Sequence, residues 1–248
     1  MAADAAVGRF FLSIQAVIFD LDGTLRVSRP RWEEIFIREA KALGAHPTPE
    51  DEWRVQRWAH YFWAGSDELH RLLRTYGESD KFWIGYNRER LLRLGCDAAC
   101  ADRLAEPLFH RLNHLQEIVQ DVVPEDVLPT LQRLRQQGYR LGLFTNRREP
   151  LNGYLEEIGL ADYLDFALVA GEVGVWKPAP EAFLKAAETA GVPPHQAAYV
   201  GDNYYADIVG ARRAGLLPVL LDPLALFPEA QNPVIRRIGE LPRVLEAH

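Results

Sequence analysis

The stretch IQAVIFDLDGTL, residues 14–25, decides how this chain folds. Its first half is a short apolar run rich in β-branched residues, which is typical of a strand buried on both faces in a parallel sheet. Its second half contains Asp20, Asp22 and Gly23, residue types that favour a turn. The stretch therefore predicts a central strand that ends in a turn carrying two carboxylates.

Similar apolar runs and helical patterns alternate along the rest of the chain. Strands that alternate with helices predict an α/β fold with a doubly wound parallel sheet, whose ligand site lies beyond the carboxyl ends of the strands. The last segment predicts a short strand or turn followed by a helix. The further strands are expected at residues 139–144, 166–170, 197–200 and 217–221, the helices at 126–137, 150–158, 180–190 and 205–214, and the last segment covers 234–248.

Residues 29–120 interrupt this alternation. They contain no convincing β-run, five of the six tryptophans, and apolar residues at helical spacing, so they predict a helical domain inserted after the first strand. Most of the aromatic residues here are expected to form a core, and a minority to line a pocket. The expected helices include 31–43, 50–63 and 68–76, and the expected domains are a core of 1–28 and 121–248 and an insertion of 29–120.

Composition excludes several classes of protein. The formal net charge of −7, with no long basic run, argues against nucleic-acid binding. The apolar run at residues 10–19 is too short to cross a bilayer and lacks the features of a secretory signal, so we interpret it as a buried strand. Only Cys96 and Cys100 are present, which excludes a disulfide framework and indicates a cytoplasmic protein. We expect these two half-buried side chains on one helix face.

Polar residues follow four of the predicted strands. Taken singly, each group has an ordinary explanation as a turn, a helix entry or a helix cap. Because the carboxyl ends of parallel strands meet at one edge of a sheet, we expect the groups to converge. They are Asp20 and Asp22 after the first strand, Thr145 and Asn146 after the second, Lys177 after the third, and Asp202 and Asp207 after the fourth.

The segments DLDGT, FTN, WKPAPEAF and GDNYYAD resemble, in order, the four motifs of the haloacid dehalogenase (HAD) superfamily. The resemblance covers residues 14 to about 222. It implies a Rossmann-like catalytic core, a helical cap of the C1 type found in phosphoglycolate-phosphatase-like enzymes, and a phosphatase with an aspartate nucleophile. One departure is Ala206, where many members carry Asn, and it puts a supporting hydrogen bond in doubt.

The chemistry of a phosphate monoester explains these residue types. A carboxylate and a phosphate are both anionic, so their approach needs a cation such as Mg²⁺, which prefers carboxylates, phosphate oxygens and water. We expect Asp20 and Asp202 to bind Mg²⁺, and the family pattern adds the backbone carbonyl of Asp22. Asp20 would attack phosphorus to form an aspartyl-phosphate. Asp22, kept protonated by crowding from other carboxylates, would protonate the leaving oxygen and then activate water.

The remaining residues would bind or support the phosphoryl group. Thr145, Asn146 and Lys177 are expected to hold phosphoryl oxygens, and the Lys177 ammonium also offsets the negative cluster. Asp207 is expected to orient Lys177 or the metal's water molecules. Whether Arg26, Arg147 or Arg148 contacts the substrate stays open at this stage.

Three functions fit this pattern. The first is a Mg²⁺-dependent phosphatase acting on a small phosphorylated metabolite. The second is a phosphosugar mutase of the same fold, in which a sugar hydroxyl replaces water, and the third is a non-catalytic binding protein that kept the fold. A dehalogenase fits less well, because it needs neither a metal nor a second aspartate at position 22. Neither the particular substrate nor the oligomeric state follows from the sequence.

Overall fold

A six-stranded parallel sheet forms the centre of the molecule. The computed structural model describes residues 13–248, so the start of the run at 10–19 lies outside the described residues. The strands are β1 (Ala16–Phe19), β4 (Arg140–Thr145), β5 (Phe166–Val169), β6 (Ala197–Gly201), β7 (Leu217–Leu221) and β8 (Val234–Ile235). Their order is β5-β4-β1-β6-β7-β8, and every neighbouring pair is parallel. This confirms the predicted doubly wound α/β fold.

The central strand β1 is buried on both faces. Val17 and Phe19 pack with Leu143 in one hydrophobic core, whereas Ile18 packs with Phe183 in the core on the opposite face. All five side chains are almost completely inaccessible to solvent. This explains why the sequence of the strand is an unbroken apolar run rather than an alternating one.

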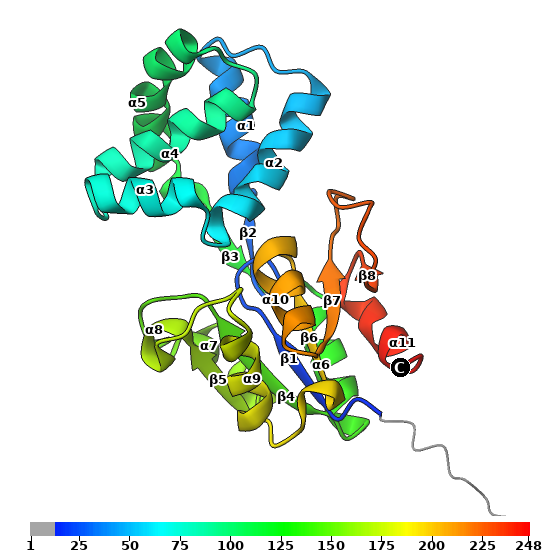
Figure 1. Cartoon of the computed structure of the whole chain (residues 1–248). Helices are drawn as coiled ribbons and strands as arrows, with labels where there is room; N and C mark the ends of the chain where they lie inside the picture. The colour runs from blue at the N-terminus through cyan, green and yellow to red at the C-terminus, as the bar shows by residue number, and fades with distance from the viewer. Residues whose placement is uncertain (1–12) are drawn as a thin grey trace, which may run out of the picture.

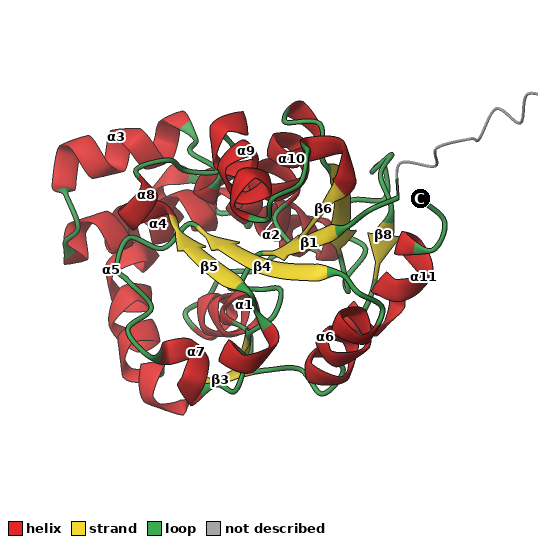
Figure 2. Cartoon of the chain, turned by 90° about the horizontal axis from the view of Figure 1, so that it is seen from below, coloured by secondary structure: helices red, strands yellow, loops and turns green. Residues whose placement is uncertain are grey.

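Helices cover both faces of the sheet, as Figure 2 shows. They are α6 (Val127–Gln136), α7 (Tyr154–Glu157), α8 (Ala170–Val173), α9 (Pro180–Thr189), α10 (Val209–Arg213) and α11 (Leu241–Leu245). Short 3₁₀ turns occupy Gln116–Ile118, Ala161–Tyr163, Pro194–Gln196 and Ile238–Glu240. The strand and helix predicted for the last segment correspond to β8 and α11.

Two predicted helices differ in detail from the structure. The helix expected at 150–158 is reduced to α7, because Asn152 and Gly153 have φ angles of 41° and 84°, which a right-handed helix cannot include. The helix expected at 205–214 begins as a π-helical turn, Tyr204–Ile208, and only then continues as α10. Sequence patterns rarely separate these two helical forms, since both place apolar residues at similar spacing.

Five helices between β1 and β4 form the predicted insertion. They lie together beyond one end of the sheet in Figure 1 and share a hydrophobic core that includes Phe36, Leu91 and Leu108. They are α1 (Trp32–Ala42), α2 (Pro49–Trp63), α3 (Asp67–Tyr76), α4 (Asp80–Arg93) and α5 (Ala98–His114). Among the helices of residues 13–248, none is long and apolar enough to cross a membrane.

A two-stranded antiparallel ladder joins the insertion to the sheet domain. It consists of β2 (Val27–Arg29) and β3 (Gln120–Val122), and Arg29 lies opposite Gln120. The expected domain boundaries at 28/29 and 120/121 fall inside this ladder. Three-residue strands with partly exposed side chains carry too little periodicity to be predicted. We propose the ladder as the junction between the two domains.

The two cysteines lie on different elements, so the prediction that they share one helix face is wrong. Cys96 follows α4, whereas Cys100 lies in the first turn of α5, and their Sγ atoms are 3.1 Å apart. A glycine turn between the two helices breaks the expected continuous helix. Both side chains are half-buried as expected, and burial raises the pKa of the Cys96 thiol to about 12. Cys96 therefore stays protonated.

Candidate active site

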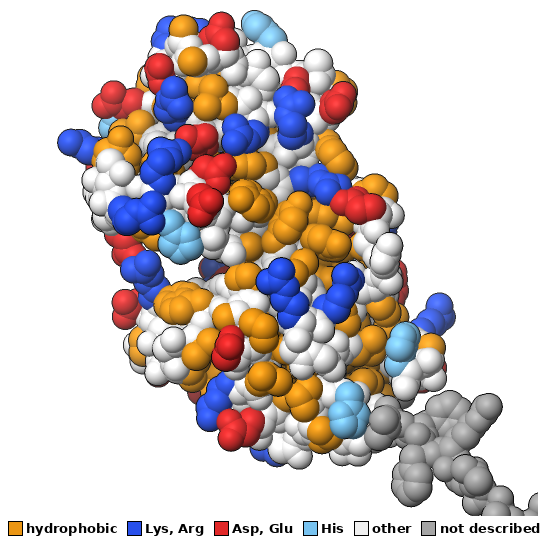
Figure 3. All heavy atoms as spheres, in the orientation of Figure 1, with side chains coloured by type: hydrophobic (Ala, Val, Ile, Leu, Met, Phe, Trp, Pro, Cys, Tyr) orange, Lys and Arg blue, Asp and Glu red, His pale blue; other side chains and the backbone are white. Residues whose placement is uncertain are grey.

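The predicted site residues line one cleft between the sheet domain and the insertion. The cleft has a volume of about 380 Å³. On one face of the molecule a narrow gap is visible between the two domains at the left edge of Figure 3. The sheet domain contributes Asp20, Asp22, Thr145, Asn146, Arg147, Lys177, Asp202, Asn203, Ala206 and Asp207, and the insertion contributes Glu33, Ala59, His60 and Trp63. The structure thus brings together the seven residues expected to act in the site, whereas Arg26 and Arg148, whose role the sequence left open, do not line this cleft: the seven are Asp20, Asp22, Thr145, Asn146, Lys177, Asp202 and Asp207.

Lys177 is the centre of a buried hydrogen-bond network. Its Nζ atom donates to Asp20 Oδ1 at 2.6 Å, to Asp207 Oδ1 at 2.7 Å and to the Tyr199 hydroxyl at 2.9 Å. Burial alone would lower the pKa of Lys177, but the carboxylates of Asp20 and Asp207 raise it well above its usual value. Lys177 therefore keeps its charge in the interior.

Tyr199 is a member of this network that sequence reasoning missed. Besides accepting from Lys177, its hydroxyl donates to the Phe144 carbonyl oxygen at 2.8 Å. Tyr199 lies inside the apolar strand β6, and aromatic residues are common at core positions of strands. No local signal distinguishes it.

Three carboxyl groups crowd together beside Lys177. One oxygen each of Asp20, Asp202 and Asp207 lies within 4.8 Å of the other two. Burial raises the pKa of Asp20 to about 7, although Lys177 opposes this shift, and burial together with Asp20 raises the pKa of Asp202 well above its usual range. Burial therefore disfavours the charged forms of Asp20 and Asp202, even though Lys177 lies beside them.

The donor set fits a small divalent cation. The Asp202 carboxylate has a single side-chain hydrogen bond within the described residues, a long one of 3.4 Å from Thr24 Oγ1. It packs so closely on Gly23 that a Cβ atom there would lie 2.5 Å from Asp202 Oδ2. Oxygen atoms from Asp20 and Asp202 are the ligands that Mg²⁺ prefers, and such an ion would relieve their mutual repulsion.

Asp22 has surroundings that differ from those expected. Arg147 binds it with two hydrogen bonds, Nε to Oδ2 at 2.8 Å and Nη2 to Oδ1 at 2.7 Å, and Arg26 Nη1 lies 3.3 Å from Oδ1. The carboxylate of Asp20 lies near enough to Asp22 to interact with it, as expected, but two guanidinium groups that were not expected also face Asp22. Hydrogen bonding to Asp22 in turn raises the pKa of Arg147. Arg26 also binds Asp121 of β3 at 2.6 Å, next to the junction ladder.

Asn146 is engaged with the backbone at position 177. Its Nδ2 donates to the Lys177 carbonyl at 2.9 Å, and its Oδ1 accepts from the Lys177 amide at 2.8 Å. Asn146 lines the cleft, but both ends of its side-chain amide are bonded to the Lys177 backbone, whereas a phosphate contact was expected. Thr145 is buried at the end of β4. Arg148 pairs with Glu78 of the insertion.

Asn203 links the sheet domain to the insertion. Its Oδ1 accepts from the amides of Tyr205 and Ala206 at 3.0 and 2.9 Å, and its Nδ2 donates to the carbonyl of His60 at 3.0 Å. It therefore caps the π-helical turn in the segment where the sequence departs from the family pattern. Arg57 of α2 adds an ion pair with Glu229.

The surroundings of His60 predict that the stability of the protein depends on pH. Burial lowers its pKa, and its ring packs edge-on against Phe227 at 5.3 Å between centroids. Below the pKa of an unfolded histidine, about 6.5, the unfolded chain binds a proton that folded His60 resists, so stability is lost as pH falls. We expect the melting temperature of His60→Gln to fall less than that of wild type between pH 7.5 and 5.5. The exposed control His46→Gln should follow wild type, and parallel curves for all three would contradict this assignment.

Comparisons with known proteins give the family. A model of the haloacid dehalogenase-like hydrolase family matches residues 14–215. A phosphoserine phosphatase of Thermus thermophilus is 33% identical over 94% of this chain and 99% of its own length. A glyceraldehyde 3-phosphate phosphatase of Methanopyrus kandleri is 30% identical over 83% of each. The crystal structure of a 2-haloacid dehalogenase from Pseudomonas syringae is 28% identical, with a TM-score of 0.54 over 94% of this chain and 99% of that one.

Fold, cleft and comparisons together define a hydrolase with a Rossmann-like sheet and a helical insertion. The chain belongs to the haloacid dehalogenase-like hydrolase family.

Proposed function

We propose that this protein is a Mg²⁺-dependent phosphatase that hydrolyses a small phosphate monoester through an aspartyl-phosphate at Asp20. The observation that supports this most strongly is the arrangement of Asp20, Asp202 and Lys177 in one cleft, with Lys177 Nζ 2.6 Å from Asp20. Relatives at 30–33% identity that are named phosphatases support the same reaction class. The two free cysteines favour a reducing compartment, so we place this activity in the cytoplasm.

In this proposal the carboxylates of Asp20 and Asp202 and the backbone carbonyl of Asp22 would hold Mg²⁺. When bound, the ion would neutralise charge on the phosphoryl group. Lys177 and Thr145 bind the transferring oxygens from the protein side. Asp207, Tyr199 and the Asn146 amide keep Lys177 in place, as their contacts indicate.

The reaction divides into two displacements at phosphorus. An Asp20 oxygen attacks, the ester P–O bond breaks, and Asp22 gives a proton to the leaving oxygen. Asp22 then takes a proton from a water molecule that attacks the aspartyl-phosphate, which releases phosphate and restores Asp20. Arg147 binds each Asp22 oxygen with one hydrogen bond, which leaves a second lone pair on each oxygen for proton transfer. The insertion acts as a lid that limits access of bulk water to the cleft.

The metal requirement can be tested by activity and by thermal stability. We expect EDTA to abolish phosphate release from p-nitrophenyl phosphate and Mg²⁺ to restore it. Because an ion that binds only the folded state stabilises it, Mg²⁺ at 100 times its Kd should add about 2.7 kcal/mol to the free energy of unfolding. Asp202→Asn should lose both responses, whereas the exposed control Asp162→Asn should keep them. Full activity in EDTA would refute the metal role.

A further inference from the structure

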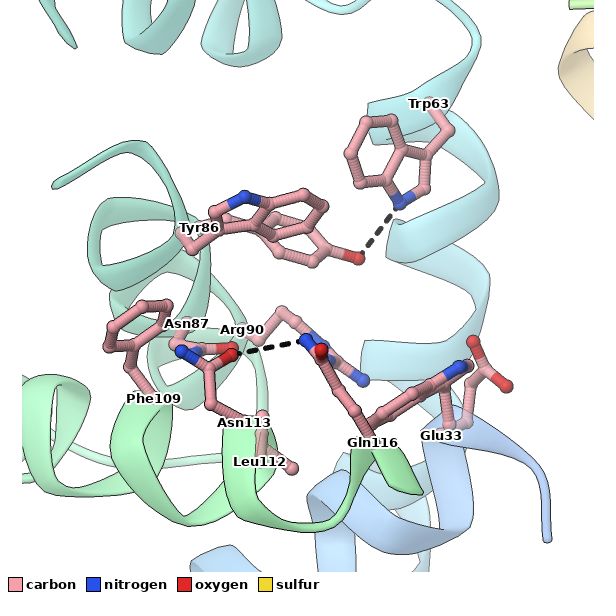
Figure 4. Close-up of a pocket in the computed structure, with 11 residues that line it drawn as sticks. Glu33, Trp63, Tyr86, Asn87, Arg90, Phe109, Leu112, Asn113 and Gln116 are labelled. Carbon is pink, nitrogen blue, oxygen red and sulfur yellow. Dashed lines mark hydrogen bonds between the residues drawn. The ribbon is translucent and has the colours of Figure 1, made fainter. Parts of the chain in front are cut away.

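A second cavity lies entirely within the insertion. Its volume is about 470 Å³, which is within the roughly 300–1,000 Å³ typical of small-molecule sites. Glu33 and Trp63 line both this cavity and the catalytic cleft, so the two spaces adjoin at these residues. Figure 4 shows the residues that enclose it. The others are Trp32, Trp83, Tyr86, Asn87, Arg90, Phe109, Leu112, Asn113 and Gln116.

Arg90 is a buried cation without an anion. Arg90 is only 6% exposed, and its Nε atom has no hydrogen-bond partner. The guanidinium group as a whole forms no ion pair or hydrogen bond with any residue of 13–248. The group lies over the ring of Phe36, with Cζ 3.5 Å from the centroid, and beside that of Tyr86 at 5.2 Å. Buried guanidinium groups are nearly always paired, since desolvation is costly. Glu33 also lines the cavity but forms no ion pair with Arg90, so the guanidinium lacks a directly bound anion among residues 13–248.

The surroundings of Arg90 combine amide groups with aromatic walls. Asn87 is 3% exposed, and Gln116 donates to Asn113 at 3.2 Å, so further polar groups face the same space. Trp63 Nε1 donates to the Tyr86 hydroxyl at 3.0 Å, which fixes two of the aromatic side chains. A rigid apolar wall with a few convergent polar groups is typical of a binding pocket.

We infer that this cavity takes the leaving group of the substrate and that Arg90 binds an anionic group on it, either a carboxylate or a second phosphate. This inference rests on the proposed phosphatase function and adds a substrate class to it. Lys177 would bind the transferring phosphoryl group, and Arg90 the second anion. Glu33 has no ion pair in the described part of the chain and lies where the two spaces adjoin. Its carboxylate repels an anion there, so the second anion must be separated from the ester.

A homologous series of substrates tests this inference. ω-Carboxyalkyl phosphates of increasing chain length would be compared with the matched ω-carboxamides, and ω-phosphonoalkyl phosphates would separate a phosphate-like anion from a carboxylate. At the length that spans the two sites, wild type should prefer an anion over the amide by about 10- to 100-fold in kcat/KM, mainly through KM. Arg90→Gln should lose this preference, Arg90→Lys should keep part of it, and the control Arg88→Gln, at a half-exposed arginine that pairs with Asp102, should keep it all.

The outcomes separate the inference from the proposed function. If wild type hydrolyses p-nitrophenyl phosphate but shows no preference at any length, or if the preference persists in Arg90→Gln, the inference is wrong and the phosphatase proposal stands. If no compound releases phosphate, the phosphatase proposal fails. Calorimetric titration with non-hydrolysable ω-carboxyalkyl phosphonates then decides the binding role alone: affinity about tenfold or more weaker in Arg90→Gln supports it, and equal affinity overturns it.

Thermal stability gives an independent readout. Arg90→Met keeps an unbranched, flexible side chain and removes an unpaired buried charge, so its melting temperature without ligand should equal or exceed that of wild type. If Arg90 instead served only to stabilise the fold, Arg90→Met would have a lower melting temperature than wild type. A lower melting temperature together with an unchanged substrate preference would overturn the binding role.

Discussion

Asp20→Asn is expected to reduce phosphate release by about 10⁴-fold or more while the protein stays folded. Asparagine has nearly the same shape as aspartate, but its amide cannot attack phosphorus to form an acyl phosphate. Lys177 retains its contact with Asp207 in the variant, so the buried ammonium is not left alone. Because burial raises the pKa of Asp20 to about 7, removal of this charge should not lower the melting temperature. Steady-state phosphate release and thermal melting measure the two effects.

The intermediate itself provides the sharper test of this prediction. Rapid acid quench followed by mass spectrometry should detect a phosphoryl group on the peptide that contains Asp20 in wild type and none in Asp20→Asn. The surface variant Asp162→Asn makes the same change of charge and should behave as wild type. Substantial Mg²⁺-dependent turnover by Asp20→Asn would refute the nucleophile assignment.

Lys177→Met is expected to destabilise the protein by about 3–5 kcal/mol and to abolish activity. Lys177 is 4% exposed and donates to both Asp20 and Asp207. Its removal leaves carboxylates whose oxygens lie within 4.8 Å of one another in a buried cluster without their cation. Urea unfolding at pH 7 gives the free energy directly.

A double-mutant cycle identifies the cause of that destabilisation. Adding Asp207→Asn to Lys177→Met removes one of the stranded charges and should recover part of the lost stability, although Asp207→Asn alone is expected to destabilise. Lys185→Met, whose lysine pairs with Glu188 on the surface, should cost less than about 1 kcal/mol. A cost below 1 kcal/mol for Lys177→Met, or no recovery in the double variant, would show that the network does not depend on the charge.

The contacts of Asp22 show where local reasoning stops. Two aspartates in a strand-ending turn can be recognised from residues 20–23 alone, because strand and turn preferences are local. The partner of Asp22 lies 125 positions away at Arg147, and only the approach of the turn after β4 to the turn after β1 brings them together. The basic pair Arg147 and Arg148 is visible in the sequence, but their oppositely charged partners, Asp22 and Glu78, could not be assigned from it.

The same limit applies to the pocket of the insertion. Arg90 sits on a helix with several other charged residues and looks in sequence like part of a solvated face. Its burial follows from packing against Phe36 of α1 and Tyr86, and its lack of a partner follows from which side chains α5 brings nearby. Both properties depend on how close other helices come to Arg90, and the periodicity of residues along its own helix does not contain that information.

Residue order alone was sufficient for the parallel sheet, the inserted helices and the convergence of Asp20, Lys177 and Asp202 at one edge. Hydrophobic periodicity and turn chemistry act over a few residues, and the geometry of parallel sheets does the rest. Tertiary structure decided which group each charged side chain contacts. Tyr199 accepts a hydrogen bond from Lys177, Arg147 binds Asp22, and the Arg90 guanidinium has no hydrogen-bond partner in residues 13–248. The physical reason is that an electrostatic contact depends on separation in space, and residues separated by 22 positions (Lys177 and Tyr199) or 125 positions (Asp22 and Arg147) meet only when the fold forms.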